Sequence, residues 1–139
     1  MVGGSYDLGM AHRSWLALVV IDVADLERGT GFWAAALRGR VVQQPYGQGI
    51  YLSVLVPTGA GEATLLVQKV PEAKTAKTRV HLDIGTDDVD AEVARLEVLG
   101  ACQQRMVVER GLRFCVMEDP DGNEFCVVPG QRSDDWPTW

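Results

Sequence analysis

The chain repeats one order of predicted elements, a strand, a helix and three more strands, twice within its 139 residues. In the first half, an apolar, β-branched run at 15–21 predicts a strand. Apolar side chains at three- and four-residue steps from Asp25 predict a helix that Gly39 caps. The other strands of this half are predicted at 40–44, 50–56 and 63–70.

The second half has the same order. Strict alternation at 79–86 predicts a strand, and a helix is predicted from Asp87 and Asp88 to Gly100. The remaining strands are predicted at 102–108, 112–117 and 124–128. The last two of these are joined by a turn whose composition, DPDGN, strongly favours chain reversal.

The spacing between the halves indicates an internal duplication, although their identity is weak. Asp25 and Asp88 open the two helices 63 residues apart, and Pro71 and Pro129 close the last strands 58 residues apart. One helix can cover only one face of four mainly antiparallel strands, and twisted sheets curl. We therefore expect an α+β fold of two βαβββ modules, with mixed, mainly antiparallel curled sheets that form a cleft on their uncovered faces.

These boundaries predict a single domain over 14–130, made of modules 14–71 and 79–130. Residues 1–13 carry no periodicity and are expected to be an N-terminal arm. Residues 131–139 form a C-terminal tail with two tryptophans, expected either to fold back on the domain or a partner or to stay free.

The composition excludes several classes of partner. The net charge is −6, without a Lys/Arg cluster, so nucleic acid is not an expected partner. The longest apolar run, 15–21, is far shorter than the roughly 20 residues that cross a bilayer. The three cysteines, Cys102, Cys115 and Cys126, have no framework spacing, which predicts reduced thiols and a cytoplasmic protein.

The alternation within the strands predicts which side chains face the cleft. We expect the helices to cover Val80, Leu82, Ile84, Leu65, Val67, Phe125 and Val127, and the core to hold Trp33, Phe114 and Met117. The uncovered face then carries Gln68, His81, Asp83, Glu124 and Cys126. The alternative is that these polar side chains lie on an ordinary solvated sheet face.

Three features together carry a family resemblance: the duplicated module, the segment 79–84 (RVHLDI) before 87–90 (DDVD), and the segment 119–126 (DPDGNEFC). Over about 14–130 the chain resembles the vicinal-oxygen-chelate superfamily, which includes glyoxalase I, bleomycin-resistance proteins and extradiol dioxygenases. It is most similar to the small glyoxalase-like domain proteins. The resemblance implies paired βαβββ modules and a homodimer.

The resemblance also implies where a metal ion would bind. Metal-dependent members hold the ion with residues, mostly His and Glu, on the first and last strands of each module. Carried over through the two offsets, these positions are Leu18, Gln68, His81 and Cys126. Leu18 has no donor atom and Gln68 is a weak ligand, so only His81 and Cys126 are candidate metal ligands.

Two ligands are too few, because a zinc site uses at least three. Asp83 and Glu124 each lie about 7 Å along a strand from the two candidate ligands. We therefore expect no cofactor, with a divalent metal as the alternative.

The expected function is a glyoxalase-like protein that binds a small organic molecule in the cleft, as a lyase or isomerase without a strong metal site. His81 is the predicted catalytic acid or base, because the pKa of an imidazole is about 6.5. Predicted ligand-binding residues are Leu18, Gln68, Asp83, Glu124 and Cys126. The alternatives are a non-catalytic protein that sequesters an antibiotic or another aromatic or cationic drug, and a divalent-metal-dependent lyase or dioxygenase.

Overall fold

The computed structural model describes residues 12–59 and 61–130, and the expectations for the first eleven residues and for the C-terminal tail lie outside them. The first module contains β1 (Val19–Val23), α1 (Leu26–Ala36), β2 (Arg40–Gln43), β3 (Tyr51–Thr58) and β4 (Gly61–Lys69). The second module contains β5 (Asp83–Thr86), α2 (Val89–Leu99), β6 (Cys102–Glu109), β7 (Leu112–Glu118) and β8 (Glu124–Pro129). Neither helix is long and apolar enough to cross a membrane.

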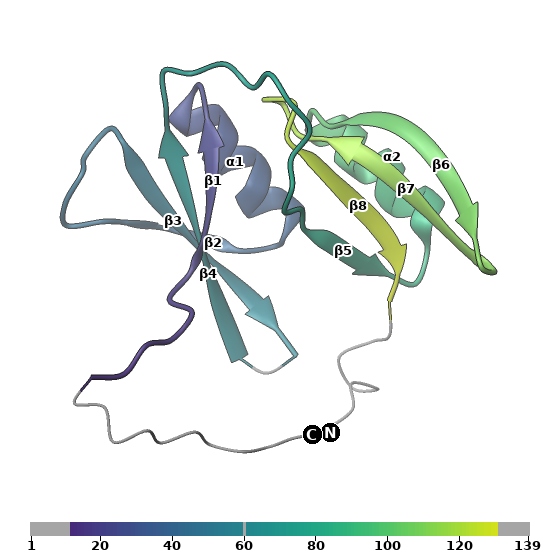
Figure 1. The fold of residues 1–139 in the computed structure, drawn as a ribbon, viewed down its shortest axis with the longest axis horizontal. Coiled ribbons are helices and arrows are strands. Elements are labelled where there is room, and N and C mark those ends of the chain that lie inside the picture. The colour runs from purple at the N-terminus through teal and green to yellow at the C-terminus, as the bar shows by residue number, and fades with distance from the viewer. Residues whose placement is uncertain (1–11, 60, 131–139) are drawn as a thin grey trace.

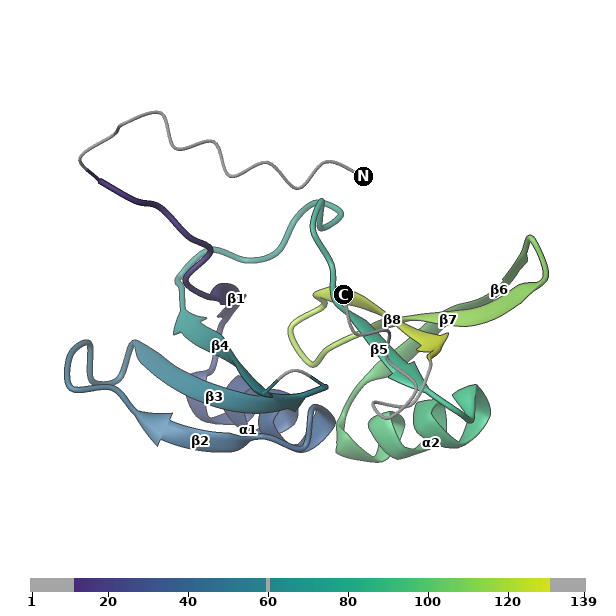
Figure 2. The same ribbon diagram turned by 90° about the horizontal axis from the view of Figure 1, so that it is seen from below.

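The two modules have the same topology. Their sheets run in the orders β1-β4-β3-β2 and β5-β8-β7-β6, with one parallel pair at the β1 or β5 edge and antiparallel pairs elsewhere. The two sheets lie next to each other (Figure 1), and both helices lie on the same side of them (Figure 2). The predicted fold class of two βαβββ modules is confirmed. We call the side of each sheet without a helix its open face.

Both helices begin where the aspartates predict. The side chain of Asp25 accepts a hydrogen bond from the Arg28 N–H, and that of Asp88 accepts one from the Ala91 N–H. These caps satisfy N–H groups that have no partner within the helix. Gly100 ends α2 in the left-handed region, at φ 113°, as expected.

The predicted end of α1 is wrong. The helix ends at Ala36, Leu37 is its C-cap, and the left-handed residue is Arg38, with φ 54°. Gly39 is needed for another reason, because a Cβ there would lie 2.6 Å from the carbonyl oxygen of Leu55. The glycine lets the chain pass β3 closely rather than capping the helix.

The alternating strand residues form the core under the helices. Leu65, Val67, Phe125 and Val127 are at most 4% exposed, so their neighbours point to the open faces. Trp33 and Met117 are also buried in this core, as predicted.

Three expectations for the strands are wrong. β1 begins only at Val19, four residues later than predicted, and β5 only at Asp83. Val80 therefore precedes the strand and is 76% exposed, instead of packing under the helix. Phe114 is half-buried on the open face, because its neighbour Cys115 takes the inward position on β7.

The turn after β7 joins the two modules. Asp119, which is 4% exposed, accepts a hydrogen bond from the Trp33 indole N–H at 2.9 Å through Oδ2. Its Oδ1 accepts from the N–H groups of Asp121 and Asn123, which fixes the shape of the turn. Asp121 in turn accepts from the Ala24 N–H at 2.8 Å, beside the start of α1. One turn of the second module thus binds both the core and the first helix of the first.

The helices meet through a second polar contact. Arg95 of α2 donates to the carbonyl oxygens of Ala35 and Ala36, at 3.1 and 2.7 Å. These carbonyls are at the C-terminal end of α1, where no intrahelical N–H is available and the helix dipole favours a cation. Together with the turn, this contact fixes the relative orientation of the modules.

Replacing Asp119→Ala tests the contribution of the turn to stability. The change leaves the Trp33 indole and two backbone N–H groups buried without acceptors, so we expect the free energy of unfolding to fall by about 3 kcal/mol. Urea denaturation followed by tryptophan fluorescence measures it. Glu62→Ala, which removes an exposed carboxylate 3.7 Å from Arg40, should change stability by less than about 0.5 kcal/mol. An equal loss in both variants would contradict the assigned role of Asp119.

Candidate functional site

A single row of side chains crosses the open face of the second sheet. The strand register pairs Asp83 with Cys126, Cys126 with Val116, and Val116 with Arg105. Strands in a sheet are about 4.8 Å apart, so Asp83 and Arg105 are separated by about 14 Å. The row begins with a carboxylate and a thiol, continues with an apolar side chain and ends with a guanidinium.

This row forms the floor of a hollow of about 390 Å³. A hollow of this size fits a small organic ligand. Its walls come from all four strands of the module and from the segment before β5: Lys77, His81, Asp83, Arg105, Leu112, Phe114, Val116, Glu124, Cys126 and Val128. One side of the hollow is thus apolar, and the other carries groups that can exchange protons or coordinate a metal.

His81 and Asp83 form the polar end. The Nε2 atom of His81 lies 3.2 Å from an Asp83 carboxylate oxygen, and both side chains are about half exposed. The expected separation of about 7 Å is therefore wrong, because His81 precedes β5 and its ring reaches over the strand. The carboxylate that contacts the imidazole is Asp83 and not Glu124.

Cys126 lies beside this pair as a neutral thiol. Burial raises the pKa of Cys126, the charge of Asp83 raises it further, and Arg105 and Lys77 only partly oppose these effects. A thiol is a poor nucleophile compared with a thiolate. Cys126 is thus suited to lining the hollow or, once deprotonated by an ion, to metal ligation.

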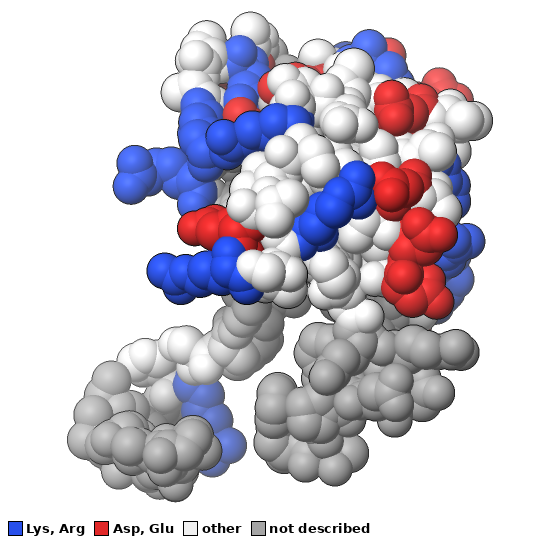
Figure 3. Space-filling view, turned by 90° about the vertical axis from the view of Figure 1, so that its right-hand side faces the viewer, with Lys and Arg blue, Asp and Glu red and all other residues white. Residues whose placement is uncertain are grey.

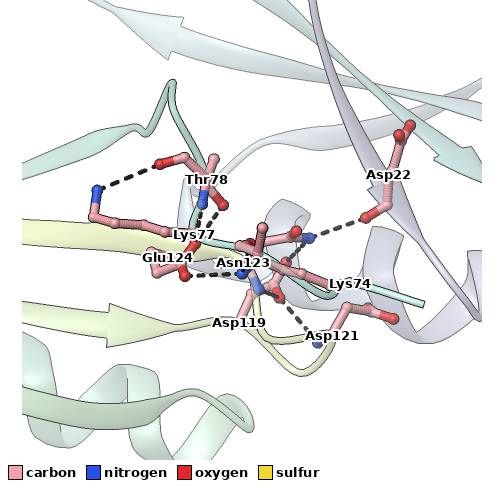
Figure 4. Close-up of polar contacts among 9 residues, drawn as sticks. Asp22, Lys74, Lys77, Thr78, Asp119, Asp121, Asn123 and Glu124 are labelled. Carbon is pink, nitrogen blue, oxygen red and sulfur yellow. Dashed lines mark hydrogen bonds and ion pairs between the residues drawn. The ribbon is translucent and has the colours of Figure 1, made fainter. Parts of the chain in front are cut away.

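Glu124 is occupied with a different task. Its carboxylate accepts hydrogen bonds from Lys74 Nζ at 2.8 Å, from the Thr78 N–H at 3.0 Å and from the Thr78 hydroxyl (Figure 4). Burial would raise the pKa of Glu124, but these bonds prevail and lower it to about 2. Glu124 therefore stays ionised and ties the linker at 70–78 to the start of β8.

Leu18 and Gln68 do not line this hollow. Leu18 is half-buried just before β1, and Gln68 lies on β4, where it pairs with Asp22 and Tyr51. The structure thus gathers His81, Asp83, Glu124 and Cys126 around one hollow but leaves the two first-module residues on another sheet.

The match of Gln68 with Cys126 is also wrong. Val20 pairs with Leu66 as Asp83 pairs with Cys126, and Val20 and Asp83 keep the 63-residue offset of the helix caps. Leu66, two residues before Gln68, therefore corresponds to Cys126. The prolines misled the alignment because β4 and β8 end at different distances from them.

Three donors of the hollow could hold a metal ion. One ligand atom each from His81, Asp83 and Cys126 lie within 4.8 Å of one another. Zinc accepts nitrogen, oxygen and sulfur ligands, and a catalytic site uses three protein ligands with a fourth position open. The set therefore fits zinc after small side-chain rotations. It fits Mn²⁺ poorly, because that ion prefers oxygen ligands.

The sequence argument missed the apolar wall. Leu112, Phe114 and Val116 face the hollow, whereas Cys115 and Met117 between them are buried. This strand is apolar on both faces, so alternation alone cannot say which set lies under the helix. The register with β8, whose inward residues are Phe125 and Val127, decides it.

The glyoxalase-like domain model matches residues 18–128, which is most of the chain and both modules. The chain belongs to the glyoxalase-like domain family. This assignment, within the vicinal-oxygen-chelate superfamily, confirms the resemblance carried by the sequence motifs. No curated protein matches the sequence of this glyoxalase-like protein.

Solved structures share its fold. TnmS3, an antibiotic binding protein from Streptomyces sp. CB03234, is 28% identical with a TM-score of 0.63, and the match covers 88% of this chain and 99% of that one. A FosX variant from Listeria monocytogenes, in complex with Mn(II) and 1S,2S-dihydroxypropylphosphonic acid, is 18% identical with a TM-score of 0.67, over 86% and 93% of the two chains. A glyoxalase/bleomycin resistance protein/dioxygenase family enzyme from Burkholderia phytofirmans PsJN is 16% identical with a TM-score of 0.63, over 80% and 94%.

The variant Glu124→Gln tests the linker anchor. Because the pKa of Glu124 is lowered in the folded state, the unfolded chain binds more protons below about pH 4.5, and the stabilisation is lost as the pH falls towards 2. We expect the variant to lose about 1–2 kcal/mol at pH 7 and much less at pH 3, measured by urea denaturation. The exposed linker variant Glu72→Gln is the control. A loss from Glu124→Gln that is independent of pH would contradict the anchor.

Proposed function

We propose that this glyoxalase-like protein binds a small organic molecule in the hollow of the second module and transfers a proton through His81. The observation that carries the proposal is that Phe114 and the His81–Asp83 pair line the same hollow. An apolar wall with a few polar groups is the usual composition of a small-molecule site.

Each side chain has a defined part in this proposal. The ring of Phe114, with Leu112 and Val116, holds the apolar part of the ligand. Asp83 accepts from His81 Nε2 and orients the imidazole, which leaves Nδ1 to accept or donate a proton on the ligand. Proton transfer next to a carbonyl is the step that an isomerase or lyase needs, and one imidazole is able to perform it.

The proton-transfer proposal is tested with small aryl ketones and aldehydes in D₂O, because a base that removes the proton next to the carbonyl exchanges it for deuterium. Proton NMR should show this exchange with the unmodified chain, and we expect His81→Gln to slow it about 100-fold. Cys126→Ser is the matched control from the same hollow and should keep most of the rate. Equal rates for His81→Gln and the unmodified chain would remove His81 from the mechanism.

Sequestration of a drug without chemistry is the second candidate function. Two observations support it: the likeness to the antibiotic binding protein TnmS3, and the aromatic wall that Phe114 provides. It is distinguished from catalysis by stoichiometric binding of an aryl compound that stays chemically unchanged and whose protons do not exchange.

A zinc-dependent lyase or dioxygenase is the third candidate, supported by the His81, Asp83 and Cys126 donors. Zinc bound there would polarise a ligand oxygen, while His81 would then be a ligand and no longer a free base. Elemental analysis of protein purified without chelators tests it. About one equivalent of zinc, lost in Cys126→Ser, supports the metal site, and less than a tenth of an equivalent ends it.

We further propose that the protein is a cytoplasmic homodimer. The three cysteines are free thiols, as a reducing compartment favours. Val19, Val20 and Val80 expose apolar surface, and homodimers commonly bury such surface. Analytical ultracentrifugation gives the mass of the particle, and a monomer at all micromolar concentrations would contradict the dimer.

A further inference from the structure

We infer that the ligand of the hollow carries an anionic group, which Arg105 and Lys77 bind while its apolar part lies on Phe114. The inference rests on the proposed function, since it names the chemical class that the same site takes. The class is an aryl or branched apolar molecule with one carboxylate, sulfonate or phosphonate group.

The first argument is the balance of charges around the hollow. Glu124 is neutralised by Lys74, and Asp83 is held by His81. Among the described residues, Arg105 makes no ion pair or hydrogen bond, and Lys77 donates only to a carbonyl oxygen at 3.4 Å. Two cations therefore line the hollow without an anion of the protein to match them.

The second argument is the position of Arg105. It ends the cross-strand row about 14 Å from Asp83, with Cys126 and Val116 between them, so the two charges cannot pair across the floor. A guanidinium presents several N–H donors in a plane that matches a carboxylate or phosphonate. A ligand that spans part of this floor would place its anionic group at Arg105 and its other end near His81.

The third argument is that the charge pattern is local. The first module has the corresponding row Val20, Leu66, Ser53 and Val42, in which valine takes the place of Arg105. On the side of the molecule shown in Figure 3, most Lys and Arg side chains lie at the left, around an uncharged surface, and most Asp and Glu side chains lie at the right. The net charge of −6 therefore does not describe the hollow, and the expectation of a cationic ligand is replaced by an anionic one.

Two fluorescent probes that differ by one sulfonate group test the inference. 8-Anilinonaphthalene-1-sulfonate is anionic, and N-phenyl-1-naphthylamine has the same ring system without charge. In titrations of the full chain at low salt, we expect the anionic probe to bind about fivefold more tightly. The preference should shrink as salt is added, because the cations are exposed.

Variants separate the two claims. Lys77→Gln with Arg105→Gln should abolish the preference for the anionic probe and leave the affinity of the neutral probe unchanged. Arg40→Gln with Lys69→Gln removes the same charges from the exposed surface of the first module and should keep the preference. Phe114→Ala should weaken both probes.

Each other outcome refutes a defined statement. Equal affinity for the two probes, with both weakened by Phe114→Ala, overturns the anionic class but leaves the proposed site in place. A preference that survives Lys77→Gln with Arg105→Gln also overturns it, because another surface then binds the anion. If Phe114→Ala weakens neither probe, the hollow does not bind them and the proposed function fails with the inference.

Discussion

The arrangement of this protein depends on the buried carboxylate of Asp119. Its two oxygens hold the turn of the second module in shape and bind the Trp33 indole of the first module. A buried carboxylate is costly to desolvate unless its oxygens accept hydrogen bonds, and here four donors surround it, including the Asn123 side chain. The turn leads directly into β8, so the same contact places Glu124 and Cys126 at the hollow.

Much of the fold follows from local signals in the sequence. The aspartate caps, the alternation of β4 and β8 and the DPDGN turn each depend on neighbouring residues, and all three are confirmed. The end of α1 was mispredicted because Gly39 is required by β3, which is distant in sequence. Phe114 and Val80 were misplaced for the same reason, since register and strand length depend on tertiary contacts.

The candidate site was only partly predictable. His81, Asp83, Glu124 and Cys126 do line one hollow, because they alternate with residues that face α2. Their chemistry depends on contacts that alternation cannot show: Asp83 rather than Glu124 contacts His81, while Glu124 binds the linker. The duplicated module thus keeps its backbone twice but carries reactive side chains on one sheet only.

The central claim is that a ligand lies on the open face of the β5–β8 sheet, between Phe114 and the His81–Asp83 pair. A crystal structure of the chain with N-phenyl-1-naphthylamine bound tests it most directly. We expect the naphthyl ring against Phe114 and Val116, with the side chains of His81 and Cys126 on the same side of the sheet. A ring bound elsewhere, or Cys126 turned beneath α2, would contradict the account.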